Sequence, residues 1–123
     1  FPIRAIGMGY ITDEAKMRRL YQAADVLLMP TLCDNLPNTI VEAMACGTPC
    51  VGFDIGGVPQ MIDHGVNGYL AQFRNSLDFA HGIHALLASP NRQALRRNAR
   101  SKALNTYSER AVADKYLEVY TAP

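Results

Sequence analysis

Continuous apolar runs alternate with helical patterns along this chain. The run at 25–30, DVLLMP, stops at Pro30 and is typical of a strand buried on both faces. The runs at 49–54 and 69–73 predict two further strands. The stretch IRAIGMGYI at 3–11 predicts another strand that leads into a loop. We therefore expect a sheet of about four strands.

Helical periodicity fills the segments between these runs. The first predicted helix follows Thr12, its expected N-cap, and carries an apolar stripe. The stripe consists of Met17, Leu20, Tyr21 and Ala24. A second helix is predicted from 38 to 46, ending at Gly47, where a glycine can close the last turn. The remaining helical predictions are a short turn within 55–68 and the segments 76–88, 91–105 and 108–120, the last with Ser108 as its cap.

Strands that alternate with helices at this spacing predict an α/β fold with a Rossmann-like parallel sheet and flanking helices. In such sheets, ligands bind outside the carboxyl ends of the strands. These ends are predicted at 7–11, 30–38, 54–59 and 72–75. The chain, residues 1–123, is expected to be one domain at most.

The composition is that of an ordinary globular chain and excludes a disordered one. Of the 123 residues, 49% are hydrophobic, and the formal net charge is +1. We expect no nucleic-acid partner, because the basic residues form no dense stripe. The local cluster Arg92, Arg96, Arg97, Arg100 and Lys102 is interpreted as a solvated helix face, with an anionic partner or a membrane surface as the alternative.

Three cysteines, Cys33, Cys46 and Cys50, lack the spacing of zinc ligands. We interpret them as reduced, mostly buried thiols of a cytoplasmic protein. No apolar run is long enough to span a bilayer, and we expect no metal and no signal peptide. The chain begins at Phe1 directly in strand-like sequence, so we expect an excised piece of a longer protein.

Two acids draw attention, one in a loop and one in a helix. Glu42 belongs to the second predicted helix, which is apolar nearly all round and is therefore expected to be buried. A buried carboxylate needs hydrogen-bond donors, and a ribose diol would supply two of them. The alternative is a structural acid that forms an ion pair or reaches the protein surface. For Asp34, the alternative is a local turn before Pro37.

The glycines Gly56 and Gly57 follow the third predicted strand, where they permit close approach of the backbone to a ligand, although ordinary turns also use such pairs. Gly65 and Gly68 are interpreted as residues of a plain tight turn. No catalytic triad, Walker A motif or dinucleotide fingerprint is present.

The segment from Gly9 to Tyr120 resembles the second half of the donor-binding domain of the family 4 glycosyltransferases. The resemblance rests on GYITDEAKMRRLYQAADVLLMP, on DNLPNTIVEAMACGTPCVGFDIGGVPQMIDHGVNGYL and on NARSKALNTYSERAVADKYLEVY, in that order. Members of this family have the GT-B fold and transfer sugars from nucleotide-sugar donors with retention of configuration. The version DNLPNT is similar to that of bacterial exopolysaccharide and capsule transferases.

The resemblance implies a role for each acid, because the E-x7-E motif of the family falls on Asp34 and Glu42. By this resemblance Glu42 binds the ribose hydroxyls, and Asp34, in place of the commoner glutamate, contacts the transferred sugar. The diphosphate and sugar would meet Asn35, Leu36, Pro37, Asn38 and Thr39, mainly through backbone amides. The base would meet Gly9, Tyr10 and Ile11.

The resemblance also implies what lies elsewhere. The Arg/Lys pair that neutralises the diphosphate, and the acceptor-binding domain, are expected before Phe1, so the fragment alone is expected to be inactive. The donor would be UDP- or GDP-linked, and no cofactor or metal is expected. The acceptor would be a glycan or a lipid-linked sugar, and the full-length protein could associate peripherally with the inner face of the membrane.

Two other classes stay open. One is a different GT-B enzyme, such as a nucleotide-sugar epimerase or a phosphorylase-like protein, although the lysines Lys16, Lys102 and Lys115 lie on predicted helices away from the strand-end loops. The other is a non-catalytic nucleotide-binding module with a similar sheet.

Overall fold

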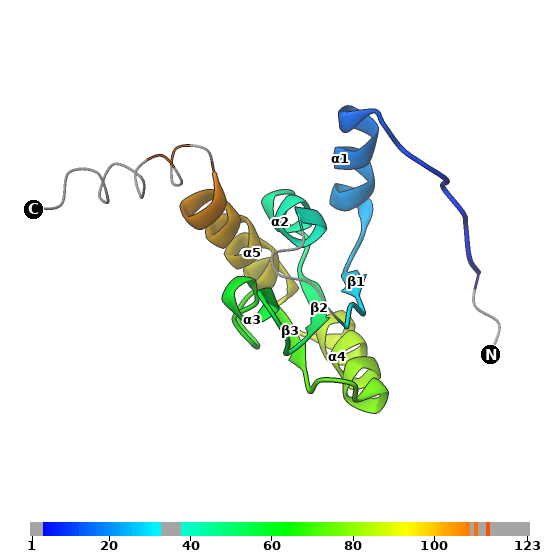
Figure 1. Cartoon of the computed structure of the whole chain (residues 1–123), viewed down its shortest axis with the longest axis vertical. Helices are drawn as coiled ribbons and strands as arrows, with labels where there is room; N and C mark the ends of the chain where they lie inside the picture. Colours follow the sequence, from blue (N-terminus) through cyan, green and yellow to red (C-terminus); the bar gives the residue numbers. More distant parts are fainter. Residues whose placement is uncertain (1–3, 33–37, 109, 111–112, 114–123) are drawn as a thin grey trace, which may run out of the picture.

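A computed structural model describes residues 4–32, 38–108, 110 and 113 as one α/β unit (Figure 1). Its sheet has three parallel strands in the order β1-β2-β3. The strands are β1 (Leu27–Met29), β2 (Cys50–Phe53) and β3 (Gly68–Ala71). The helices are α1 (Glu14–Ala23), α2 (Asn38–Ala45), α3 (Val58–Met61), α4 (Ser76–Ala88) and α5 (Arg92–Tyr107). The predicted α/β class with a parallel sheet is confirmed.

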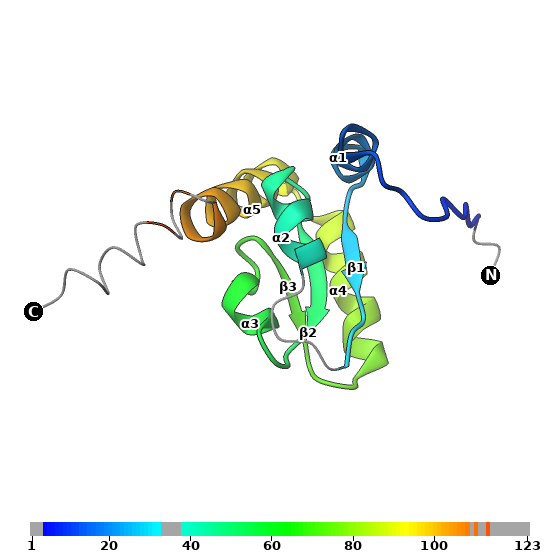
Figure 2. The same ribbon diagram turned by 45° about the horizontal axis from the view of Figure 1, so that its top comes forward.

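Helices cover both faces of the sheet, as Figure 2 shows. Alternate residues of β2 point to opposite faces, as in any strand. Cys50 packs in a core cluster with side chains of α2, α3 and α5. Val51 and Phe53 pack in a second cluster with side chains of α4 and with Leu95. The central strand is buried along its whole length, which fixes the register of the sheet.

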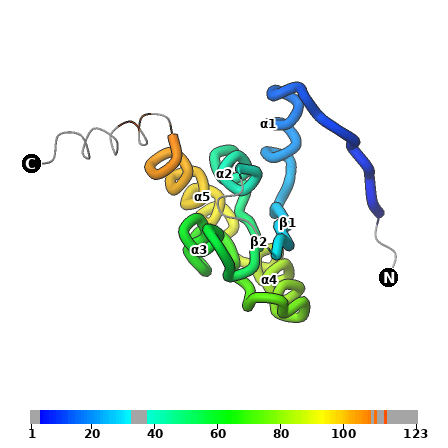
Figure 3. The backbone as a smooth tube through the Cα atoms, viewed as in Figure 1, coloured from blue at the N-terminus to red at the C-terminus, as the bar shows by residue number. Residues whose placement is uncertain are grey.

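The strand predicted at 3–11 does not form over the described residues 4–11, and this prediction is wrong. The segment has no regular secondary structure, and residues 4–10 are exposed. Figures 1 and 3 show it running from α1 away from the sheet. A strand needs hydrogen bonds to a neighbour. Here the outer edge of β1 has no partner strand among the residues that the structure describes.

The helix boundaries agree with the predictions to within two residues, and the N-cap of α1 is shifted by one residue. Asp13, and not Thr12, caps α1, because its Oδ1 accepts hydrogen bonds from the amides of Ala15 (2.9 Å) and Lys16 (3.4 Å). The prediction for 76–88 matches α4 residue for residue. The helix predicted at 108–120 lies almost entirely outside the described residues. No helix in the described part of the chain is long and apolar enough to cross a bilayer.

Arginines of α5 hold the ends of α1 and α2. Arg96 is half-buried, so the interpretation of this cluster as a solvated face is wrong for it, whereas Arg92, Arg97 and Arg100 are exposed as predicted. Arg96 donates hydrogen bonds to the carbonyls of Gln22 and Ala24, each at 3.1 Å. Arg100 donates to the carbonyl of Ala45 at 2.6 Å. Cations at helix C-termini satisfy free carbonyls and interact favourably with the helix dipole. These contacts fix α1 and α2 relative to each other.

The carboxylate of Asp78 ties the loop after β3 to the first turn of α4. It accepts hydrogen bonds from the amide of Gln72 and from the hydroxyl of Tyr69, each at 2.6 Å. These hydrogen bonds lower the pKa of Asp78 below its ordinary value. The bond from Gln72 has the larger effect and the bond from Tyr69 the smaller one. Hydrogen bonds to the charged form favour that form.

Asp78→Asn is therefore expected to lower Tm at neutral pH and to weaken the acid dependence of stability. A lowered native pKa adds stability that is present above the ordinary carboxyl value, 3.8, and is lost as pH falls through the native value. Thermal unfolding followed from pH 7 to pH 2 measures this effect. Tyr69→Phe, which removes one of the two donors, should give a smaller change of the same sign. An acid dependence identical in wild type and Asp78→Asn would contradict the assignment.

Candidate functional site

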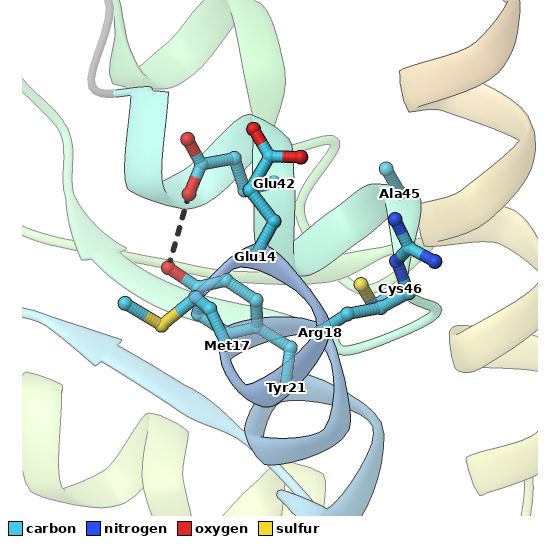
Figure 4. A pocket seen from close by; sticks show the side chains of 7 residues that line it. All are labelled: Glu14, Met17, Arg18, Tyr21, Glu42, Ala45 and Cys46. Carbon is cyan, nitrogen blue, oxygen red and sulfur yellow. Dashed lines mark hydrogen bonds between the residues drawn. The ribbon is translucent and has the colours of Figure 1, made fainter. Parts of the chain in front are cut away.

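A groove of about 300 Å³ separates α1 from α2 (Figure 4). From α1 it is lined by Glu14, Met17, Arg18 and Tyr21, and from the other side by Glu42 and Ala45 of α2 and by Cys46, which directly follows α2. This volume is at the lower end of the range of small-molecule sites. The groove contains both charges and apolar surface, so it suits a ligand that carries hydroxyl groups as well as a flat or apolar part.

Glu42 lies in this groove but is exposed, so the prediction that it is buried is wrong. The buried side of α2 consists of Ile40, Ala43 and Met44, while the side that carries Glu42 faces α1. None of the residues of α1 is buried, so this helix covers α2 only loosely. The carboxylate is consequently open to a ligand. It forms no ion pair with Arg18, which points toward Ala45 and Cys46.

A tyrosine of α1 holds one oxygen of this carboxylate. The hydroxyl of Tyr21 donates a hydrogen bond to Glu42 Oε2 at 3.3 Å (Figure 4). Burial raises the pKa of Tyr21, and the charge of Glu42 and this hydrogen bond raise it further. The carbonyl of Tyr21 accepts a hydrogen bond from the hydroxyl of Thr48, which is fully buried. Tyr21 is thus anchored at its backbone while its hydroxyl reaches Glu42.

The α2 helix begins at Asn38. Asn38 is exposed and Thr39 is half-buried at the first turn of the helix, where free amides and the positive end of the helix dipole lie. Four predicted site residues, Asp34, Asn35, Leu36 and Pro37, lie outside the described residues. Their predicted contacts with sugar and diphosphate stay predictions.

The end of α2 is closed by Gly47, as predicted. Gly47 has φ of 78°, and its amide donates to the carbonyl of Met44 at 2.9 Å. The next amide, that of Thr48, donates to the carbonyl of Ala43 at 2.9 Å. This pair of bonds is the Schellman motif. It turns the chain so that Thr48 reaches back to Tyr21 and α1, and a local turn thereby links the two walls of the groove.

The residues predicted to meet the base lead directly into α1, one wall of the groove. Gly9 has φ of 65°, Tyr10 is 95% exposed, and Ile11 is half-buried. None of the three lines the groove itself. Their segment is joined to Glu14, the first groove residue of α1, by only two intervening residues.

The predicted glycines of the loop after β2 lie at the carboxyl edge of the sheet and not in the groove. Gly56 is exposed with φ of 59°, a backbone conformation that glycine adopts without strain. Gly57 is buried and begins the short helix α3. The structure therefore separates the predicted residues into two places, the groove around Glu42 and the loops that follow the strands.

Sequence reasoning missed several groove residues. The sequence pattern places Tyr21 and Met17 only in an apolar stripe, and it indicates only a mostly buried thiol at Cys46. Cys46 is half-buried in the groove wall, whereas Cys50 is fully buried, which raises the pKa of its thiol to about 12. The sequence signal for Tyr21 is a polar hydroxyl group at the edge of an apolar helix stripe. The acceptor of its hydrogen bond, Glu42, lies 21 residues away along the chain. Within the described ranges, no group of three or more metal-ligating side chains occurs.

Comparison with known proteins gives a family match. The family model described as "Glycosyl transferases group 1" matches residues 4–89. A D-inositol 3-phosphate glycosyltransferase of Geodermatophilus obscurus is 36% identical over 102 residues, which cover 83% of this chain and 22% of the relative. The chain spans only 15–30% of the length of such curated relatives.

Solved structures with the same fold agree with this match. The sucrose-phosphate synthase of Thermosynechococcus elongatus superposes with a TM-score of 0.73 at 27% identity, covering 82% of this chain and 26% of that one. Anabaena HepE, solved in complex with UDP, superposes with a TM-score of 0.75 at 25% identity, covering 85% and 29%. The same protein was also solved with UDP-glucose.

Proposed function

This chain belongs to the group 1 glycosyl transferases, and from that premise we propose that the complete protein transfers a sugar from a nucleotide-sugar donor to an acceptor hydroxyl. The observation that carries the proposal is the exposed carboxylate of Glu42 in a groove that has space for a ligand. In this proposal the ribose of the donor binds at Glu42, because a carboxylate accepts hydrogen bonds from two neighbouring hydroxyls.

The remaining parts of the donor follow from this placement. The base extends toward Gly9, Tyr10 and Ile11, which precede α1. The diphosphate lies at the first turn of α2, near Asn38, where backbone amides and the helix dipole favour negative charge. Asp34 contacts the transferred sugar. Charge that develops on the departing diphosphate is stabilised by the same amides.

The finer features of the reaction are also proposals. Family resemblance supports transfer with retention of configuration, no metal requirement, and a role in the synthesis of polysaccharides or glycoconjugates at the cytoplasmic side of a membrane. The complexes of HepE with UDP and UDP-glucose favour a UDP-linked donor over a GDP-linked one. The acceptor, a glycan or a lipid-linked sugar, would be bound by a domain outside this chain.

Calorimetry with the complete protein tests the proposal directly. UDP and UDP-sugars are expected to bind, with GDP much weaker and ADP as the negative control. NMR of the glycoside product then shows whether its anomeric configuration is the same as that of the donor sugar. Failure of both UDP and GDP to bind would remove the basis for a nucleotide-sugar donor at this site.

The groove offers a second test that requires no substitution. UDP at ten times its Kd is expected to slow alkylation of Cys46 by iodoacetamide about tenfold, because only unoccupied protein would react. Cys50 serves as an internal reference, since it is buried and its pKa of about 12 keeps it in the unreactive thiol form. Peptide mass spectrometry assigns the modified residue. Unchanged alkylation of Cys46 at saturating UDP would place the nucleotide elsewhere.

A further inference from the structure

We propose that Tyr21 is a positioning residue that holds the Glu42 carboxylate for the ribose hydroxyls, and that it thereby sets the preference for ribonucleotides over 2′-deoxyribonucleotides. The inference rests on the proposed function, since it presumes that ribose binds at Glu42. It goes beyond that function by assigning a role to a residue of the opposite helix.

The contact itself crosses the groove. The hydroxyl of Tyr21 on α1 donates to Glu42 Oε2 on α2 at 3.3 Å, and both side chains line the same groove (Figure 4). Glu42 is exposed, and a free glutamate side chain loses rotamer entropy when it is fixed. A donor that already restricts the carboxylate reduces this cost at the moment of binding.

Tyr21 is suited to this task because it is itself restrained. Its side chain packs against the core cluster that contains Ile40 and Met44. Its carbonyl accepts the hydrogen bond from Thr48, whose side chain is fully buried. A tyrosine has only two side-chain torsions, so packing and this backbone bond define the position of its hydroxyl. Tyr21 thereby connects the core to an acid that is otherwise exposed.

The bond to Tyr21 does not compete with ribose. An ionised carboxylate has two oxygens with about four acceptor positions in total. Tyr21 uses one position on Oε2 and leaves Oε1 and the remaining position on Oε2 for two ribose hydroxyls. The raised pKa of Tyr21 keeps the phenol protonated, and therefore a donor, at neutral pH. The other charged groups of the groove are Glu14 and Arg18.

The ribose is remote from the bond that breaks, so holding it stabilises the bound donor and the transition state equally. Loss of such uniform binding raises KM and leaves kcat nearly unchanged. Tyr21→Phe is therefore expected to raise the KM for the donor about fivefold, the typical effect of one hydrogen bond, with kcat within about twofold of wild type.

The experiment compares UDP with 2′-deoxy-UDP in the complete protein by calorimetry. Wild type is expected to prefer UDP by at least tenfold, because the 2′-hydroxyl donates to a charged group. Tyr21→Phe should reduce this preference about three- to fivefold. The matched control is Tyr107→Phe, which also removes a half-buried phenol, there a donor to the carbonyl of Gln60 at 3.3 Å, and should leave the preference unchanged.

Glu42→Ala in the same assay separates the two hypotheses. If Glu42→Ala abolishes the preference for UDP over 2′-deoxy-UDP while Tyr21→Phe keeps the wild-type ratio of the two affinities, only the role of Tyr21 is overturned. If Glu42→Ala itself retains the wild-type ratio, ribose binding at Glu42 is wrong and the positioning role is wrong with it. Equal loss of UDP and 2′-deoxy-UDP affinity in Tyr21→Phe would indicate a purely structural role.

A spectroscopic titration provides an independent measurement. The pKa of Tyr21 is expected to fall in Glu42→Ala, because the charge of Glu42 and the hydrogen bond both raise it, while the contribution of burial remains. Difference absorbance against Tyr21→Phe isolates the phenol of interest. A Tyr21 pKa that is identical in wild type and Glu42→Ala would show that the contact does not exist in solution.

Discussion

Replacing Glu42 with alanine is expected to weaken UDP binding roughly 100-fold and to reduce turnover at low donor concentration by the same factor. The carboxylate would accept two hydrogen bonds from the ribose, and bonds to a charged group contribute about 1.5–3 kcal/mol each. Because the site is exposed, we take the lower figure for each bond, about 3 kcal/mol in total, which corresponds to roughly 100-fold. Isothermal titration calorimetry and initial rates measure the effect.

The fold should survive this substitution. Glu42 is exposed and lies outside both core clusters, so the free energy of unfolding should change by no more than about 0.5 kcal/mol. Glu42→Gln retains one acceptor oxygen and should lose about tenfold in affinity. The matched control is Asp25→Asn, which removes an exposed carboxylate that pairs with Arg92 instead. UDP affinity within about twofold of wild type in Glu42→Ala would contradict the ribose role.

The parts of the fold that the sequence predicts correctly are those that depend on local patterns. The helix at 76–88 was predicted to the residue, and the second helix ends at Gly47 because a glycine there can adopt positive φ. The central strand was predicted from its apolar run and is buried throughout. The family motif also singles out Glu42, which lies in the groove between α1 and α2, while its contact with ribose stays a prediction.

The parts that failed depend on what packs against a segment. The apolar stretch at 3–11 has strand propensity, but its described residues have no neighbour with which to form hydrogen bonds. Glu42 sits on a short apolar helix, yet it is exposed because α1 leaves that side open. The acceptor of the Tyr21 hydroxyl lies 21 residues away, and the two acceptors of Arg96 lie more than 70 residues away. No local pattern contains such pairings.

A consequence of this packing is that the groove depends on the sheet behind it. Arg96 and Arg100 attach the ends of α1 and α2 to α5, and α5 packs against the same core cluster as β2. Substitutions that disrupt the sheet should therefore lower both the donor affinity and the stability of the protein. A substitution of Glu42 should lower only the donor affinity. This difference allows a structural variant to be distinguished from a binding variant.

The largest loss of stability is expected from Gly68→Ala. Gly68 was interpreted from the sequence as a turn residue, but it is the buried first residue of β3 and pairs with Cys50. An added Cβ would lie 2.4 Å from the carbonyl oxygen of Cys50 and 3.2 Å from Ile62 Cγ2. Cys50 also pairs with Leu27 on its other side, so its backbone cannot move without disturbing both ladders. We expect a loss of about 3 kcal/mol, at the upper end of overpacking effects.

For a chain of this size, that loss corresponds to a decrease in Tm of roughly 10 °C. Gly7→Ala is the matched control, because its Cβ would meet nothing within 4 Å and it should change stability by no more than about 0.5 kcal/mol. Gly82→Ala distinguishes a clash with a side chain from a clash with the backbone. Its Cβ would lie 2.3 Å from the ring of Tyr69, and a side chain can move more readily than a strand. A decrease in Tm for Gly68→Ala no larger than that for Gly7→Ala would show that β2 and β3 do not pair in this register, because only that register places a backbone carbonyl against Gly68.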